Sequence, residues 1–306
     1  TATASPEVRA EIAQRLGLRS PKIVVTGFDR PNIHLRVRGL TGAALKQREL
    51  LALLANRAES GIVYVATRKN AETVAAALLE ADHVAAAYHA GLKRSERTER
   101  QEAFMSGRTS IIVATSAFGM GIDKPDVRFV VHYDVPDSLD SYYQEVGRAG
   151  RDGDPAWAML FFSERDLNLK RFFAGGGKLT EADLDAVLQS LSRHVSLTQV
   201  ELQQATGLSK SKLARALARL EDQGVIQRGF GGPIASEPLP ADNVSFARSA
   251  AIEAQEGLRR RRNDMLEEMR AYARARSCRR AALLTHFGQE TAATCSGCDN
   301  CELGAA

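Results

Sequence analysis

The first 173 residues alternate short apolar runs with amphipathic stretches, and this alternation constrains the fold more than any other feature of the chain. Apolar runs predict buried strands, whereas apolar residues at helical spacing predict helices. Strands that alternate with helices are typical of the α/β class, in which helices cover both faces of a parallel sheet. We predict strands at residues 22–27, 61–66, 84–88, 110–114, 129–132 and 156–162, and helices at 43–57, 69–80, 93–106 and 139–146.

The loops after several of these strands are polar or contain glycine, at residues 66–70, 88–93 and 115–124. In an open parallel sheet, ligands bind at the carboxyl ends of the strands. We therefore expect the functional residues of this region to lie in those loops.

The middle of the chain has the pattern of a small helical domain. Three glycines at 175–177 indicate a domain boundary. Helices at 179–192, 198–206 and 212–223, a strand at 225–228 and a Gly-rich loop at 229–233 then follow the layout of a winged helix. A plain helical connector is the alternative. Residues 234–243 are a linker or the far edge of the wing, and residues 244–276 predict a long helical stretch broken into a hairpin.

These patterns together predict three domains. They are an α/β lobe at residues 1–174, a winged helix at 178–243, and a cysteine-containing module with a helical hairpin at 244–306. A length of 306 residues is sufficient for each to bury its own core.

All four cysteines lie between Cys278 and Cys301. In a reducing compartment such a cluster is more often a metal site than a disulfide framework. The thiolates of Cys295, Cys298 and Cys301 converge in a tight turn, and Cys278 completes a tetrahedron, which is the ligand set of a structural zinc site. An iron–sulfur cluster is the alternative. We expect His286 to be a packed histidine, since four thiolates already satisfy the ion.

Charge and hydropathy add little that is specific. A net charge of +4 is mild, and the arginine run at 259–262 is more typical of a solvated helix face than of a nucleic-acid site. No apolar run approaches the roughly 20 residues that span a bilayer, and no signal peptide opens the chain. We expect a cytoplasmic protein that does not contact a membrane.

The segment SYYQEVGRAGRDG at residues 141–153 contains two arginines in a Gly-rich turn after a helical run. Arg148 and Arg151 are three residues apart, so both guanidinium groups can point toward a triphosphate held on another surface. The chain contains no G-x-x-x-x-G-K-[ST] loop and no acidic pair after an apolar strand that would hold magnesium. We therefore expect the triphosphate to be bound by a part that this chain lacks.

With these features together, the chain resembles the RecQ family of superfamily-two DNA helicases over residues 1–173 and 276–301. Its TATA opening resembles motif III, and FDRPN at 28–32 resembles the segment that leads into the second RecA-like lobe. Residues 61–68 resemble motif IV, and YHAGL at 88–92 the loop that follows it. TSAFGMGID at 115–123 resembles motif V, and QEVGRAGR at 144–151 resembles motif VI.

The resemblance implies nucleotide-linked roles for several residues. Arg151, and secondarily Arg148, would stabilise charge on the γ-phosphoryl group of ATP, and Gln144 would sense the nucleotide. Asp123, after the glycines of the preceding loop, would couple the nucleotide cleft to DNA; those glycines are Gly119 and Gly121. The alternative is a loop cap for Asp123 and a simple tight turn for the two glycines.

The resemblance also implies DNA contacts. Thr115 would hold a DNA phosphate, and we expect Arg68 and His89 to contribute to the same DNA surface. In the winged helix, residues 212–223 would be the recognition helix, with basic side chains toward phosphates at Lys210, Lys212, Arg215 and Arg219. Acidic residues outnumber basic ones between 180 and 243, which weakens phosphate affinity and favours protein docking as the alternative.

The function implied is that of the C-terminal part of an ATP-dependent 3′→5′ DNA helicase, which acts on single-strand/duplex junctions in repair or recombination. ATP and Mg²⁺ would bind the full-length protein, whose first RecA-like lobe is missing here, so this fragment would be inactive alone. The winged helix before the zinc module resembles a divergent bacterial branch, which would be nucleoid-associated. The alternative is a non-enzymatic DNA- or protein-binding module.

Overall fold

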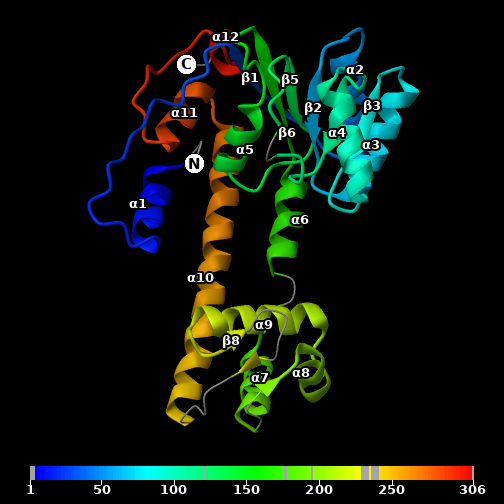
Figure 1. Ribbon diagram of the computed structural model, residues 1–306. Helices are drawn as coiled ribbons and strands as arrows, with labels where there is room; N and C mark the ends of the chain where they lie inside the picture. The colour runs from blue at the N-terminus through cyan, green and yellow to red at the C-terminus, as the bar shows by residue number, and fades with distance from the viewer. Residues whose placement is uncertain are drawn as a thin grey trace. The chain divides into compact units, whose positions relative to one another are not determined.

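The structure is a computed structural model that describes residues 4–119, 122–175, 178–193, 196–228, 234–235 and 241–304 (Figure 1). It divides into two compact units, one of residues 1–170 with 265–306 and one of residues 171–264. The cysteine-containing C-terminal residues therefore belong to the same unit as the α/β lobe. The predicted boundaries at 174 and 244 differ from this division and remain predictions.

A six-stranded sheet forms the centre of the first unit. Every neighbouring pair is parallel, which confirms the predicted α/β class. Every residue of three of the four inner strands is buried, as expected for strands covered on both faces. The order is β1-β6-β5-β2-β4-β3, with β1 at Ile33–Gly39, β2 at Gly61–Tyr64, β3 at Ala85–Tyr88, β4 at Ile111–Ala114, β5 at Phe129–His132 and β6 at Ala156–Phe162.

The predicted strand at 22–27 is wrong. These residues have no regular structure, and the side chains of Ile23 and Val24 are 59% and 71% exposed. An apolar run becomes a strand only where a neighbouring strand offers hydrogen bonds, and β1 occupies that edge instead by pairing with β6. We did not predict β1, because its polar residues break the apolar pattern.

Two different sets of helices cover the two faces of the sheet. Alternate residues of β2 point to opposite sides, with Ile62 in one apolar cluster and Val63 in the other. The Val63 side is covered by α2 (Ala43–Leu54) and α3 (Arg68–Glu80). The Ile62 side includes residues of α4 (Arg94–Met105) and α5 (Leu139–Val146), and also apolar residues from the C-terminal helices.

Five further helices of the described residues contribute to this unit, and two of them, α6 (Glu164–Gly175) and α10 (Ala241–Arg274), do so only in part, because residues 171–264 belong to the second unit. Neither α1 (Pro6–Arg15) nor α6 was predicted, and α6 begins in this unit. α10, α11 (Arg279–His286) and α12 (Asp299–Glu302) lie in the C-terminal part. α10 is one continuous helix of 34 residues, so the predicted hairpin is wrong. Its only glycine, Gly257, does not adopt the positive φ that would end a helix there.

The second unit has the winged-helix fold that the sequence predicts. Ser209 caps α9 through its side chain, and Gly207 ends α8 in the left-handed conformation. Residues 234–235 pair with the strand after α9, so they form the far edge of the wing; the predicted loop 229–233 and Gly176–Gly177 lie outside the described residues. The elements are α7 (Glu181–Arg193), β7 (Ser196–Leu197), α8 (Gln199–Thr206), α9 (Lys210–Asp222), β8 (Gln227–Arg228) and β9 (Ile234–Ala235), with a sheet order β7-β9-β8.

The helices of the described residues include none with the length and apolar character needed to cross a bilayer.

We predict that Gly61→Ala destabilises the first unit by about 1–3 kcal/mol, the usual range for overpacking a core. Gly61 pairs with Phe129 across β2 and β5, and a Cβ at Gly61 would lie 2.1 Å from the Phe129 ring. That ring stacks on Trp157, the only tryptophan of the chain, so urea unfolding followed by tryptophan fluorescence reports the change.

Gly39→Ala is the matched control, since Gly39 is also a terminal residue of a strand of this sheet but a Cβ there would meet no atom within 4 Å. Equal unfolding midpoints for the two variants would contradict the prediction.

A candidate zinc centre and the arginine turn

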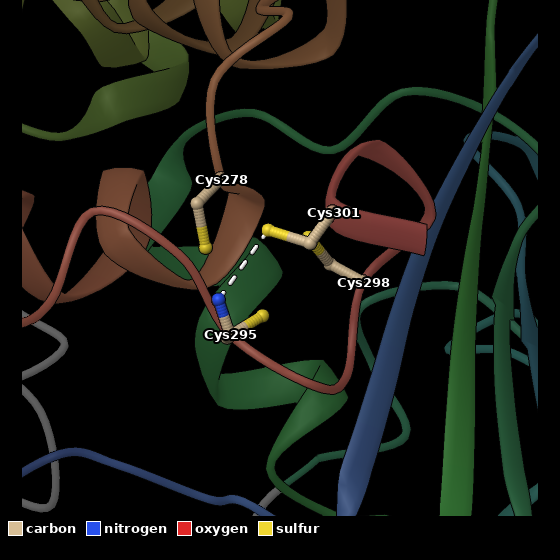
Figure 2. Close-up of side chains that lie close together, drawn as sticks. All are labelled: Cys278, Cys295, Cys298 and Cys301. Carbon is tan, nitrogen blue, oxygen red and sulfur yellow. Dashed lines mark hydrogen bonds between the residues drawn. The ribbon is translucent and has the colours of Figure 1, made fainter. Parts of the chain in front are cut away.

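Four thiols converge at the C-terminal end of the chain (Figure 2). The Sγ atoms of Cys278, Cys295, Cys298 and Cys301 all lie within 4.8 Å of one another. A tetrahedral zinc site with Zn–S bonds of about 2.3 Å requires sulfur atoms about 3.8 Å apart, so this donor set fits zinc. The four predicted ligands are therefore brought together. His286 is not among them: it is half-buried, and its Nε2 lies 3.1 Å from Asp140 Oδ2.

Main-chain amides point at the sulfur atoms. The Cys278 Sγ accepts from the amide of Ala281 at 3.4 Å, and the Cys301 Sγ accepts from the amide of Cys295 at 3.3 Å. Burial raises the pKa of the Cys278 thiol to about 12. Burial also disfavours the Cys298 thiolate, but hydrogen bonds from backbone groups outweigh it and lower that pKa to about 7. A bound cation would replace the protons of these thiols.

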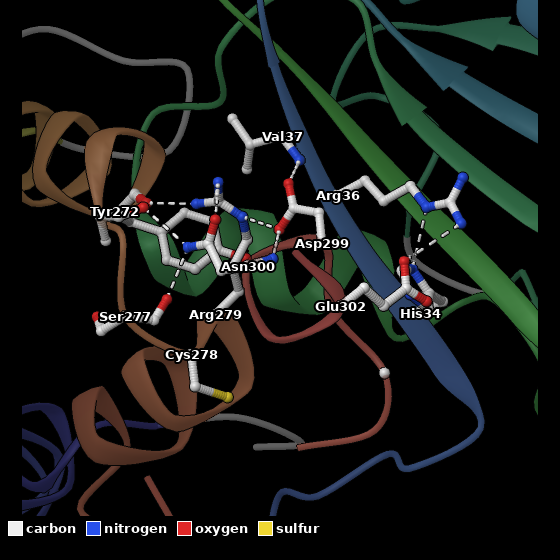
Figure 3. Close-up of polar contacts among 12 residues, drawn as sticks. His34, Arg36, Val37, Tyr272, Ser277, Cys278, Arg279, Asp299, Asn300 and Glu302 are labelled. Atoms are coloured by element: carbon white, nitrogen blue, oxygen red, sulfur yellow. Dashed lines mark hydrogen bonds and ion pairs between the residues drawn. The ribbon is translucent and has the colours of Figure 1, made fainter. Parts of the chain in front are cut away.

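A buried arginine beside the first cysteine binds residues 295–301, which we call the cysteine loop (Figure 3). Arg279 is 5% exposed, and its Nε donates to Asp299 Oδ1 at 2.5 Å. Its other two nitrogens donate to the Tyr272 carbonyl at 3.0 Å and to Asn300 Oδ1 at 3.2 Å. The side-chain Nδ2 of Asn300 in turn donates to the carbonyls of residues 275 and 277, at 2.8 and 2.7 Å. Both ends of the module are thereby fixed relative to each other.

The cysteine loop also covers the free edge of the sheet. The amide of Leu35 in β1 donates to the Gly297 carbonyl at 3.0 Å, and Leu35 forms a bridge with Cys298. The amide of Val37 donates to Asp299 Oδ2 at 2.8 Å. An exposed edge strand is open to unwanted pairing, and the loop occupies this one.

The second candidate site is the arginine turn, residues 147–153, which follows α5. The Arg148 Nη1 donates to the Gly119 carbonyl at 2.6 Å, and the Arg151 Nη1 donates to the Ile122 carbonyl at 3.0 Å and pairs with Asp123. Four of the predicted nucleotide-linked residues therefore lie together: Gly119, Asp123, Arg148 and Arg151. Gly121 lies outside the described residues. The Arg148 Nε is buried and has no partner among the residues that the structure describes.

Two residues that we did not predict donate hydrogen bonds to the main chain of the arginine turn. Arg30 donates to the carbonyls of Gly147, Ala149 and Gly150 at 3.1, 2.8 and 2.7 Å. Asn32 donates to the Gly150 carbonyl at 2.8 Å and to the carbonyl of residue 154 at 2.9 Å. Gly150 has a φ of +57°, and a Cβ there would lie 2.4 Å from the Asn32 amide nitrogen, so only glycine fits.

The other predicted residues of the lobe are distributed as follows. Gln144 is exposed on α5, and Thr115 is half-buried directly after β4. Arg68 is exposed at the start of α3, where the Thr67 side chain caps the helix. His89 is buried: its Nδ1 accepts from the Gly91 amide at 3.2 Å, and its Nε2 lies 2.7 Å from Glu72 Oε1. Both ring nitrogens of His89 are thus used within the lobe.

A buried lysine that we did not predict organises the carboxyl ends of the strands. Lys46 is 3% exposed and donates to Asp166 Oδ2 at 2.6 Å and to Asp134 Oδ1 at 3.2 Å. The other oxygen of Asp134 accepts from the Ala66 amide at 2.8 Å and from Asn70 Nδ2 at 2.9 Å. Burial raises the pKa of Asp166. This network fixes the loop that precedes α3 beside a polar pocket of about 80 Å³.

In the winged helix, two of the predicted DNA contacts are already engaged. Lys212 lies 2.7 Å from Asp183 Oδ2 on α7, and Arg219 lies 2.9 Å from Asp222 Oδ2. Arg215 and Lys210 are exposed on the surface of α9. These pairs lower the positive charge that α9 can offer to a phosphate.

We predict that the chain binds one zinc ion and that Asn300→Ala weakens zinc affinity by about 10–100-fold, the usual effect of removing an outer-sphere hydrogen bond. The variant retains four thiols but loses the two hydrogen bonds that position the segment before Cys278 and also the acceptor of Arg279 Nη2. Competition with a chromogenic chelator measures the affinity. Glu302→Gln on the same short helix is the control, and an iron–sulfur absorption band in purified protein would contradict the prediction.

Three family models match the chain. The model described as helicase conserved C-terminal domain matches residues 45–153, the winged helix-turn-helix DNA-binding model matches 186–227, and the RecQ zinc-binding model matches 241–302. The three matches follow one another along the chain without overlap.

Curated relatives match the chain as well. The ATP-dependent DNA helicases RecQ of Pasteurella multocida and Bacillus subtilis are 46% and 44% identical to it, over 54% and 56% of this chain. The chain spans 26% and 29% of their lengths. A viral protein of Acanthamoeba polyphaga mimivirus, named as an ATP-dependent RNA helicase, is 29% identical over 98% of this chain and 41% of its own. The three family matches and the bacterial relatives support the resemblance of this chain to the RecQ family of helicases.

Proposed function

We propose that this chain supplies the arginine-bearing half of an ATP-dependent DNA helicase, together with its zinc module and a winged helix. The observation that carries the proposal is the arginine turn. Arg148 and Arg151 emerge from one turn, and both reach the loop after β4. ATP and Mg²⁺ would be bound by a first RecA-like lobe, and the two arginines would contact the γ-phosphate across the cleft between lobes.

Arg151 is the stronger candidate for the phosphate contact. Its side chain is 34% exposed, and its partner Asp123 is 85% exposed. An ion pair this exposed contributes about 0–1 kcal/mol, so a triphosphate can replace the Asp123 carboxylate. Release of Asp123 at that moment would signal nucleotide binding to the loop that begins at Thr115. Gln144, exposed on the helix that precedes the turn, would report the same event.

The proposed DNA surface lies at the carboxyl ends of β2, β3 and β4. Arg68 is exposed at the start of α3, and Thr115 follows β4. These side chains and nearby amides would position phosphates of one strand without reading its sequence. His89 would act indirectly, by holding the loop at Gly91 beneath Arg68, whose Nη1 would lie 3.0 Å from a Cβ on that glycine. A 3′→5′ polarity, action at single-strand/duplex junctions in repair or recombination, and a place at the bacterial nucleoid in the cytoplasm complete the proposal.

The role of the winged helix has two candidates. Phosphate contact through Arg215 and Lys210 is favoured by the exposure of both residues. Protein docking is favoured by the excess of acidic residues between 180 and 243 and by the ion pairs that engage Lys212 and Arg219.

We predict that this chain alone shows no DNA-stimulated ATP hydrolysis, because it lacks a phosphate-binding loop. In a protein that carries both lobes, Arg151→Lys should lower kcat by a factor on the order of 10³, since a lysine cannot reproduce the planar contact of an arginine finger. Steady-state ATPase assays with single-stranded DNA measure both. Arg57→Lys, which changes an exposed ion pair with Glu59 in the same lobe, is the control. Turnover by the pure chain would refute the proposal.

The two roles of the winged helix predict different salt dependences. If α9 contacts phosphates, Arg215→Ala should reduce the slope of log affinity against log salt by about one for a forked duplex. Arg219→Ala should change the slope less, because Arg219 is already paired with Asp222. Fluorescence anisotropy at several salt concentrations measures the slopes. Identical slopes for wild type and Arg215→Ala would leave protein docking as the role of this domain.

A further inference from the structure

Residues 28–32, which we call the bridge segment, contact the zinc module on one side and the arginine turn on the other. The amide of Phe28 donates to Gln289 Oε1 at 2.7 Å, just beyond α11. Its ring stacks on Phe287, with ring centroids 5.0 Å apart. Its carbonyl accepts from the hydroxyl of Tyr143, on the helix that leads into the arginine turn. The segment is therefore fixed between two elements that are more than 100 residues apart in the sequence.

An ion pair connects the bridge segment to the zinc module. Arg280, two residues after Cys278, lies 2.7 Å from Asp29 Oδ1 and donates to the Ile33 carbonyl at 2.8 Å. Arg280 is 8% exposed, and a Cβ on Gly297 in the cysteine loop would lie 2.8 Å from its Nη2. The guanidinium thus fills the space between the cysteine loop and the bridge segment. Movement of either would displace it.

On the other side, Arg30 binds the end of α5. The carbonyls at and beyond a helix C-terminus have no partner within the helix, and the helix dipole makes this end negative. One planar guanidinium donates to three such carbonyls, those of Gly147, Ala149 and Gly150. Charge-assisted bonds of this kind are roughly twice as strong as neutral ones, and their fork geometry fixes direction. The carbonyls of this set flank Arg148 on both sides and precede Arg151.

We propose that the bridge segment couples the zinc module to the arginine turn, with Arg30 as the positioning residue for Arg148 and Arg151. Zinc fixes the start of α11 through Cys278, which fixes Arg280; Arg280 holds Asp29, and Arg30 beside it holds the turn. The consequence for ATP hydrolysis rests on the function proposed above. The mechanical coupling does not, because it concerns contacts within this chain alone.

Hydrogen–deuterium exchange of this 306-residue chain tests the role of Arg30. In Arg30→Ala, peptides that cover residues 147–153 should exchange at least about tenfold faster, while α3 peptides and zinc content remain unchanged. Arg30→Lys should give an intermediate rate, because an ammonium group cannot reach three carbonyls at once. Arg38→Ala, which removes an arginine of β1 paired with Glu49, is the matched control. Unchanged exchange at 147–153, or equal acceleration throughout the lobe, would overturn the proposal.

Zinc removal tests the rest of the path. In wild type, a chelator should accelerate exchange at residues 147–153, and Asp29→Asn should do so with zinc still bound. In Arg30→Ala, the chelator should add little at the turn, since residues that act through one path are non-additive. Fully additive effects of chelation and Arg30→Ala would overturn the coupling.

The functional consequence is measured in a protein that carries both lobes. Arg30→Lys should lower kcat for DNA-stimulated ATP hydrolysis about tenfold or more, with the KM for ATP within about twofold of wild type, because it misplaces a group that acts in the transition state. If exchange at the turn changes but kcat does not, the coupling stands and the proposed role of the two arginines fails.

Discussion

The rest of the first unit depends on two buried arginines that fix the cysteine loop against the edge of the sheet. Arg279 and Arg280 are 5% and 8% exposed, and each is bonded to a carboxylate and to at least one main-chain carbonyl. A buried guanidinium is tolerated only when such partners compensate for its lost hydration. Their positions next to Cys278 mean that the metal site and the sheet edge are organised by the same few residues. A rearrangement of either the metal site or the sheet edge would leave a buried guanidinium without its partners.

This arrangement makes the zinc module a structural layer of the lobe. Leu266, Met269 and Leu283 share one apolar cluster with Ile62 and Val130 of the sheet. In a simple α/β fold, helices that alternate with the strands cover both faces of the sheet. Here one face is covered partly by residues more than 100 positions further along the chain. Because metal binding contributes to folding where ligands are brought together by the fold, a metal ion held by the four thiolates would also stabilise this face.

The sequence predicted the elements whose residues report their own surroundings. Continuous apolar runs identified β2, β4 and β5, and close cysteine spacing identified the metal ligands. The edge strand β1 could not be identified, because a polar loop covers its edge and its sequence therefore mixes polar with apolar residues. Residues 22–27 are more apolar, but they are exposed and do not pair with another strand. Lys46, Arg30 and Arg280 were missed for a related reason. Each acts through carbonyls or carboxylates distant in sequence, and a lone basic residue gives no local signal of that. The only indication in the region of Arg30 was the resemblance of FDRPN, residues 28–32, to the segment that leads into the second RecA-like lobe.

The two arginines of the turn are held in different ways, and this difference bears on what each can do. Arg148 is half-buried, with its side chain over Gly119, where a Cβ would lie 3.2 Å from its Nη2. Its direction is therefore set by the loop after β4. Arg151 is held by an exposed carboxylate and one carbonyl, contacts that a more highly charged ligand can replace. Arg148 thus connects the turn to the loop after β4, while Arg151 remains able to exchange its partners. Such a division requires the main chain between them to stay fixed, and the carbonyls of that main chain are the ones that Arg30 binds.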